Sequence, residues 1–149
     1  MSSLLIRHGE WVVVCDGAKA LILENSGDIN VPNLKTVQVF EQKDLATHEL
    51  GTGAPGRTFN SVGNMRGAVE QTDWHDLSER AFLTQLVHHL DSAISAGKTK
   101  SLIVVAPPRA LGMIRPVYSH ALKGAVRIEV DKDLVKMPVH EIEKRLTGG

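Results

Sequence analysis

The chain has a single cysteine, no net charge and no long apolar run. Cys15 alone can form neither an internal disulfide nor a thiolate metal cluster, and its apolar surroundings favour a buried thiol over a nucleophile. Lysine plus arginine equals aspartate plus glutamate, at 17 each, so no overall field draws the molecule to nucleic acid or to an anionic membrane. No run approaches the roughly 20 apolar residues of a membrane span, and the start has no apolar core of signal-peptide length. We therefore expect a cytoplasmic protein without a membrane partner.

Several enzyme motifs are missing as well. There is no G-x-S-x-G elbow, no P-loop lysine pattern and no H-x-x-x-H pair among the seven histidines. Gly51, Gly53 and Gly56 satisfy G-x-G-x-x-G, but Pro55 lies inside the motif and no helical pattern follows it, which argues against a dinucleotide site. The sequence therefore predicts no catalytic residue, no metal and no cofactor. Asp16, at the end of the first strand, leaves open a metal-dependent nuclease or hydrolase, which would need further carboxylates beside it.

The most informative segment that the chain does contain is Leu50–Val69, which has five glycines, two arginines and no acidic residue. Connections in compact domains usually have about 4–6 residues, and structureless loops beyond roughly 12–15 are functional or disordered. Glycines let backbone N–H groups approach a ligand, and Arg57 and Arg66 each offer a planar set of donors to phosphate or carboxylate. This composition favours anion binding, although a mobile surface loop is the plain alternative.

The remaining pattern indicates an α/β fold, with a mixed β-sheet flanked by helices, in a single domain over residues 1–149. Apolar alternation, helical spacing and turn residues mark the elements. We expect a hairpin over 11–25 around Asp16-Gly17, strands at Leu34–Glu41, Ser101–Ala106 and Ala125–Val130, and helices from about Asp76 or the residues before it to Ala96, from Arg109 to His120, and from Pro138 to Leu146.

Two further arginines flank the turn and the short helix after the central strand. Arg109 and Arg115 lie where strand ends meet helix N-termini, a natural place for anions. Residues 76–149 hold 11 basic and 8 acidic side chains, so a local basic patch is possible there. We predict that Gly56, Arg57, Arg66, Arg109 and Arg115 bind RNA or another ligand, provided that the fold gathers them. The alternative is that the arginines cap helices or pair with Glu70, Asp73 and Asp76.

The chain also resembles a bacterial family of proteins required for attachment to host cells. The resemblance rests on WVVVCDGAKALILEN, PGRTFNSVG, EQTDWHDLSERAFLTQLVHHL, LIVVAPPRALGMIR, VDKDL and PVHEIEKRL, in this order from Trp11 to Leu146. It implies a likeness to the central domain of archaeal and eukaryotic peptide-chain release factors, with a ribonuclease-H-like mixed sheet and a functional loop before its long helix. The loop lacks the Gly-Gly-Gln of true release factors, so ester hydrolysis on the ribosome is not expected.

Three hypotheses on function follow. The leading one is a non-catalytic, cytoplasmic, release-factor-like domain that binds RNA or the ribosome through the glycine-rich loop and its arginines. The second is a metal-dependent nuclease or hydrolase that uses Asp16. The third is a protein-interaction module that acts in bacterial adhesion, with a homo-oligomer as one possible form.

Overall fold

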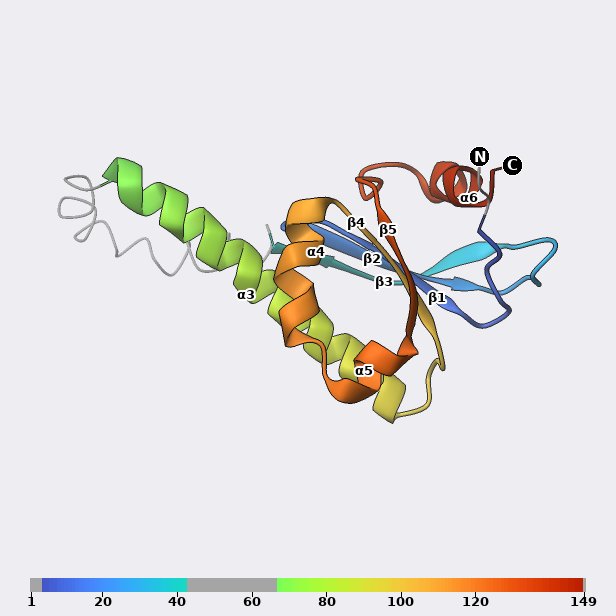
Figure 1. The fold of residues 1–149 in the computed structure, drawn as a ribbon. Helices are drawn as coiled ribbons and strands as arrows, with labels where there is room; N and C mark the ends of the chain where they lie inside the picture. Colours follow the sequence, from blue (N-terminus) through green and yellow to red (C-terminus); the bar gives the residue numbers. More distant parts are fainter. Residues whose placement is uncertain (1–3, 43–66, 149) are drawn as a thin grey trace.

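A computed structural model of the chain describes residues 4–42 and 67–148. Three consecutive strands come first, and after them helices alternate with strands (Figure 1). In chain order they are β1 (Trp11–Cys15), β2 (Lys19–Asn25), β3 (Leu34–Glu41), α3 (Gly67–Ser95), β4 (Leu102–Ala106), α4 (Pro108–Ile114), the 3-10 turn η3 (Arg115–Val117), α5 (His120–Ala125), β5 (Val126–Asp131) and α6 (Val139–Thr147).

The described strands form one mixed five-stranded sheet in the order β3-β2-β1-β4-β5. β1, β2 and β3 are antiparallel neighbours, whereas β1, β4 and β5 run parallel. The first hairpin turns at Asp16, whose Oδ1 accepts hydrogen bonds from the backbone N–H groups of Ala18 and Lys19, at 2.8 and 2.9 Å. The predicted α/β class, the mixed sheet and the hairpin are confirmed.

Apolar side chains fill both faces of the sheet, which is why β1 and β4 are buried throughout. Helices α3, α4 and α5 cover one face, and α6 covers the other together with the segment before β1. The face under α3 is packed by Trp11, Val13, Ile22, Val104, Phe82, Leu83, Leu86, Leu90, Leu111 and Leu122. The face under α6 is packed by Ile6, Val12, Val14, Leu23, Ile103, Val105, Ile142 and Leu146.

Helix α3 begins earlier than the spacing of its apolar residues indicates. It includes 67–69, the end of the glycine-rich segment, which were predicted as loop. Apolar periodicity marks only the part of a helix that packs on a core, so it cannot locate a start that lies beyond the core. Figure 1 shows the N-terminal part of α3 projecting past the sheet. Its C-terminal end was predicted well, because Gly97 adopts a φ of 75° two residues after Ser95.

The helix predicted over Arg109–His120 ends early, as α4 and the 3-10 turn η3, and α5 begins only at His120, where the predicted helix was to end. Pro116 cannot donate the backbone hydrogen bond that a continuous helix needs, and Ser119 starts α5 by accepting a bond from the N–H of Leu122 at 2.9 Å. The last strand lies one residue later than predicted, and α6 begins directly after Pro138. None of the described helices is both long and apolar enough to cross a membrane.

Candidate functional site

The structure separates the residues that the sequence singled out. Gly56, Arg57 and Arg66 lie outside the described residues. Arg109 is near the start of α4, and Arg115 directly follows its last residue. Arg109 and Arg115 bind different carboxylates, so their surroundings are described separately.

Arg109 clamps α4 to α3. Its Nη2 lies 2.8 Å from Oδ1 of Asp76, and its Nε donates to Oε1 of Glu79 at 2.9 Å. The hydrogen bond and the charge of Glu79, followed by those of Asp76, hold the pKa of Arg109 above its ordinary value. The pKa of Asp76 is lowered, first by its bond from Arg80. Two carboxylates neutralise Arg109, which favours the pairing alternative over anion binding at this residue.

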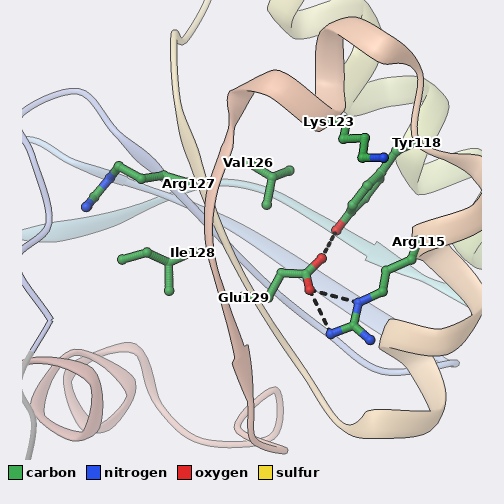
Figure 2. Close-up of a pocket in the computed structure, with 7 residues that line it drawn as sticks. All are labelled: Arg115, Tyr118, Lys123, Val126, Arg127, Ile128 and Glu129. Carbon is green, nitrogen blue, oxygen red and sulfur yellow. Dashed lines mark hydrogen bonds and ion pairs between the residues drawn. The ribbon is translucent and has the colours of Figure 1, made fainter.

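Arg115 lines a groove at the edge of the sheet, with a volume of about 620 Å³. The groove follows β5, and in the described part of the chain no strand lies beyond β5. Its lining residues come from η3, from the turn after it, from α5 and from β5 itself: Arg115, Tyr118, Lys123, Val126, Arg127, Ile128 and Glu129 (Figure 2). We call this feature the β5 groove. Three of these side chains are cationic and one is a carboxylate.

Glu129 organises the helix side of the β5 groove. Its Oε1 accepts from Nε of Arg115 at 2.8 Å, and its Oε2 accepts from the hydroxyl of Tyr118 at 2.9 Å. The hydrogen bond between Arg115 and Glu129, together with the charge of Glu129, raises the pKa of Arg115. The pKa of Tyr118 is also raised, first by burial and then by the bond to Glu129. Both groups therefore keep their ordinary charge states at neutral pH.

Arg127 lies on the other side of β5 (Figure 2) and binds the buried side chain of Glu10. The register of β5 against β4 shifts where Leu102 pairs with Val126 and Ile103 with Ile128, so Arg127 is the extra residue of a bulge. Its Nε and Nη2 each donate to one oxygen of Glu10 at 2.7 Å, and Nη2 also donates to the carbonyl of Leu5 at 2.7 Å.

Glu10 is a buried carboxylate that holds this end of β5. Its side chain is fully buried, and it also accepts from Oγ of Ser101 at 2.8 Å and from the N–H of Arg7 at 3.0 Å. Burial alone would raise the pKa of Glu10, but the bonds from Arg127, Arg7 and Ser101 outweigh burial and lower it. Arg127, which lines the β5 groove, therefore belongs to a fixed, ionised pair with Glu10.

Lys123 adds an exposed cation from α5. Glu129 pairs with Arg115 and Glu10 pairs with Arg127, so the positive charge in excess of these two carboxylates comes from Lys123. Among the residues that the structure describes, no histidine and no cysteine lines the groove. This composition suits binding of an anionic group better than acid–base chemistry at neutral pH.

The residues proposed for metal chemistry do not gather in the part of the chain that the structure describes. Asp16 caps the first hairpin, and no group of three or more histidine, cysteine or acidic side chains is placed to hold a metal ion among the described residues. Phe40 contacts the ring of His89 edge-on, with centroids 4.9 Å apart. Cys15 is buried, and burial raises the pKa of its thiol to about 12, so it is not a nucleophile.

Sequence reasoning found Arg115 but missed Tyr118, Lys123, Arg127 and Glu129. One signal was available: in VRIEVD, charged and apolar residues alternate, a pattern of strands that are only partly covered. The continuous apolar run of β4 is typical of a strand buried on both faces. The contrast between these two parallel strands indicates that β5, and not β4, lies at an open edge.

Comparison with known proteins identifies the family. The family model described as "Protein required for attachment to host cells" matches residues 11–146. The chain belongs to this family. A relative, an uncharacterized protein of Rickettsia prowazekii (strain Madrid E), is 32% identical over 75 residues, and the match covers 49% of this chain and 50% of the relative. The chain thus spans about half the length of that relative.

The chain shows a weak similarity to a solved structure. It is the ethanolamine utilization protein EutJ from Carboxydothermus hydrogenoformans, with 15% identity and a TM-score of 0.38. The similarity covers 86% of this chain and 47% of that protein. At this TM-score the likeness indicates neither the fold nor the ligand of this chain.

Proposed function

We propose that this member of the host attachment family is a non-catalytic binding protein that holds an anionic partner in the β5 groove. The observation that carries the proposal is the placement of Arg115, Lys123 and Arg127 around a hollow that contains one carboxylate. The three cationic side chains come from separate elements, so the fold and not a local charge run brings them together.

The described titratable groups of the groove support binding over catalysis. A general acid or base works best with a pKa near the operating pH. The pKa values of Arg115, Tyr118 and Arg127 are all shifted upward, further from neutrality. Glu129 is engaged by two donors and is not a free base. Such groups supply fixed charge and hydrogen-bond donors.

RNA or the ribosome is the anionic partner that the sequence predicts, and we retain it as one form of the proposal. Arg115 is the predicted RNA-binding residue that lines the β5 groove, while Arg57 and Arg66 belong to the segment outside the described residues. A ribonuclease-H-like sheet and a cytoplasmic location belong to the same proposal. The strand order β3-β2-β1-β4-β5, with a long helix between the third and fourth strands, is compatible with that sheet.

The test is a titration of the isotope-labelled protein with two anionic probes, single-stranded oligouridylate and polyglutamate, at low and moderate salt. We expect at least one probe to shift the amide signals of the β5 groove, and added salt to weaken binding. Lys123→Glu should abolish the shifts at low salt. Lys35→Glu is the matched control, because Lys35 is exposed on β3 at the opposite edge of the sheet. If neither probe shifts the groove signals, the proposed function is wrong.

A further inference from the structure

We infer that the partner in the β5 groove is an extended, acidic polypeptide segment of another protein, which adds to the sheet as a strand beside β5. This inference rests on the proposed function, because it concerns the same groove. It specifies the chemistry of the partner and the way in which the partner binds.

The backbone of β5 can pair with an added strand, because β5 is an edge strand of the described sheet. An edge strand presents unpaired N–H and C=O groups at every second residue, and an added strand satisfies them. After the bulge at Arg127, the stretch Ile128–Asp131 pairs with Ile103–Ala106 in unbroken register. This regular stretch offers a straight template for a segment of similar length. The β5 groove opens along the same strand and shares Ile128 and Glu129 with this stretch.

The cationic side chains that line the groove lie on both sides of β5 (Figure 2). Figure 2 shows Arg115, Lys123 and Tyr118 on one side of the strand and Arg127 on the other. Successive side chains of an extended polypeptide point to opposite faces of a sheet. An added strand can therefore direct one acidic side chain toward Arg115 and Lys123, and the next toward Arg127.

The side chains of β5 are only partly buried, which leaves apolar surface for a partner to cover. The side chains from Val126 to Val130 are all half-buried, although Val126 packs on the core under α3, and Ile128 and Val130 pack on the core under α6. An added strand with apolar residues among its acidic ones would cover the exposed part of these side chains. Burial of apolar surface contributes about 25 cal/mol per Å², in addition to the backbone hydrogen bonds.

The same features favour a polypeptide over RNA. Proteins that bind single-stranded RNA combine a positively charged groove with aromatic rings on which successive bases stack. Tyr118 is the aromatic residue that lines the groove, and its hydroxyl is held by Glu129. Glu129 repels phosphates and carboxylates alike, but an amide backbone can in addition pair with the N–H and C=O groups of β5.

The experiment compares three short synthetic peptides with oligouridylate, using the isotope-labelled full chain. The first peptide alternates glutamate and valine, the second alternates lysine and valine, and the third is the glutamate peptide with alternate backbone amides methylated. We expect only the first peptide to bind and to slow the amide exchange of residues within Ile128–Asp131. Lys123→Glu should weaken its binding at least about tenfold, because an attraction becomes a repulsion, while Lys35→Glu should leave binding unchanged.

The other outcomes separate the inference from the proposed function. If oligouridylate binds the β5 groove and the glutamate peptide does not, the strand-addition inference is overturned while the proposed function stands. If the methylated peptide binds as tightly as its parent, strand addition is also overturned, because backbone pairing is then not used. If neither the three peptides nor oligouridylate bind, the inference is overturned. If polyglutamate also fails to bind, the proposed function is wrong as well.

Discussion

The two edges of the sheet differ in what accompanies the outer strand. β3 carries exposed side chains along most of its length, with Val37 and Val39 each 46% exposed. β5 has half-buried side chains, a groove beside it, and a bulge residue tied to a buried carboxylate. The pairing of each strand with its neighbour has one register irregularity, and in β5 it lies before the regular stretch Ile128–Asp131.

The difference indicates that an open edge becomes a candidate site only when other elements surround it. At β3, α6 contributes Glu143, which accepts a hydrogen bond from the N–H of Leu34 at 3.0 Å, whereas η3 and α5 stand beside β5 and supply Arg115, Tyr118 and Lys123 to the groove. The rigid support of the β5 edge comes from inside, through Glu10. Substitutions at the β5 edge should therefore lower the free energy of unfolding much more than substitutions at the β3 edge.

The largest effect is expected for Glu10→Ala, which removes the anchor of the β5 edge. Arg127 would lose its carboxylate partner, and Ser101 and the N–H of Arg7 would lose an acceptor. Breaking a buried ion pair costs about 3–5 kcal/mol, and we expect about 3 kcal/mol because the side chain of Arg127 is 25% exposed and can reach water. Urea unfolding measures this loss. A loss below about 1 kcal/mol would show that Glu10 does not anchor β5.

The same carboxylate predicts how stability depends on pH. The pKa of Glu10 is lowered in the folded chain from an ordinary value of 4.5. The contribution of Glu10 is therefore complete above that ordinary value, and it is lost as the pH falls through the lower pKa of the folded state. The stability difference between the wild type and Glu10→Ala should narrow as the pH falls below 4.5. Urea titrations at a series of pH values test this, and a difference that widens toward acid would contradict it.

A smaller effect is expected for Gly27→Ala, in the connection that leads to β3. A Cβ at Gly27 would collide with the backbone carbonyl oxygen of Val31, and it would lie 3.0 Å from the backbone nitrogen of Asn33. Overpacking of this kind costs about 1–3 kcal/mol, and here the obstacle is backbone, which cannot rotate away.

The control for Gly27→Ala is Gly112→Ala in α4, where an added Cβ meets nothing within 4 Å. There we expect no loss, and a gain of up to about 1 kcal/mol, because alanine favours a helix over glycine. Thermal unfolding of both variants makes the comparison. Equal losses at the two glycines would mean that the connection before β3 does not constrain Gly27.

The contrast between the edges also shows how far sequence reasoning reaches. Strand and helix order follows from apolar spacing and turn residues, which are local properties of the chain, and the mixed sheet follows from that order. The partners of the arginines are not local. Arg109 pairs with Glu79, 30 residues earlier, and Arg115 with Glu129, 14 residues later. Spacing alone could not distinguish a neutralised clamp from the wall of a groove.

Glu10 illustrates the same limit more strongly. In the sequence it is one acidic residue before an apolar strand, yet its partner Arg127 is 117 positions away. Only the parallel pairing of β1, β4 and β5 brings the two residues together. The predicted ligand residues Gly56, Arg57 and Arg66 lie outside the described residues, so their part in binding stays a prediction.

The smallest effect is expected for Glu41→Gln on β3, which completes the comparison of the edges. Glu41 and Lys19 lie 4.0 Å apart, and each side chain is 37% exposed. Ion pairs of this kind contribute between about 0 and 1 kcal/mol, because water and salt screen the charges. Urea unfolding should therefore barely distinguish Glu41→Gln from the wild type, and added salt should remove any difference. A loss as large as that of Glu10→Ala would mean that the β3 edge is anchored as firmly as the β5 edge, and the distinction between an open edge and a supported one would fail.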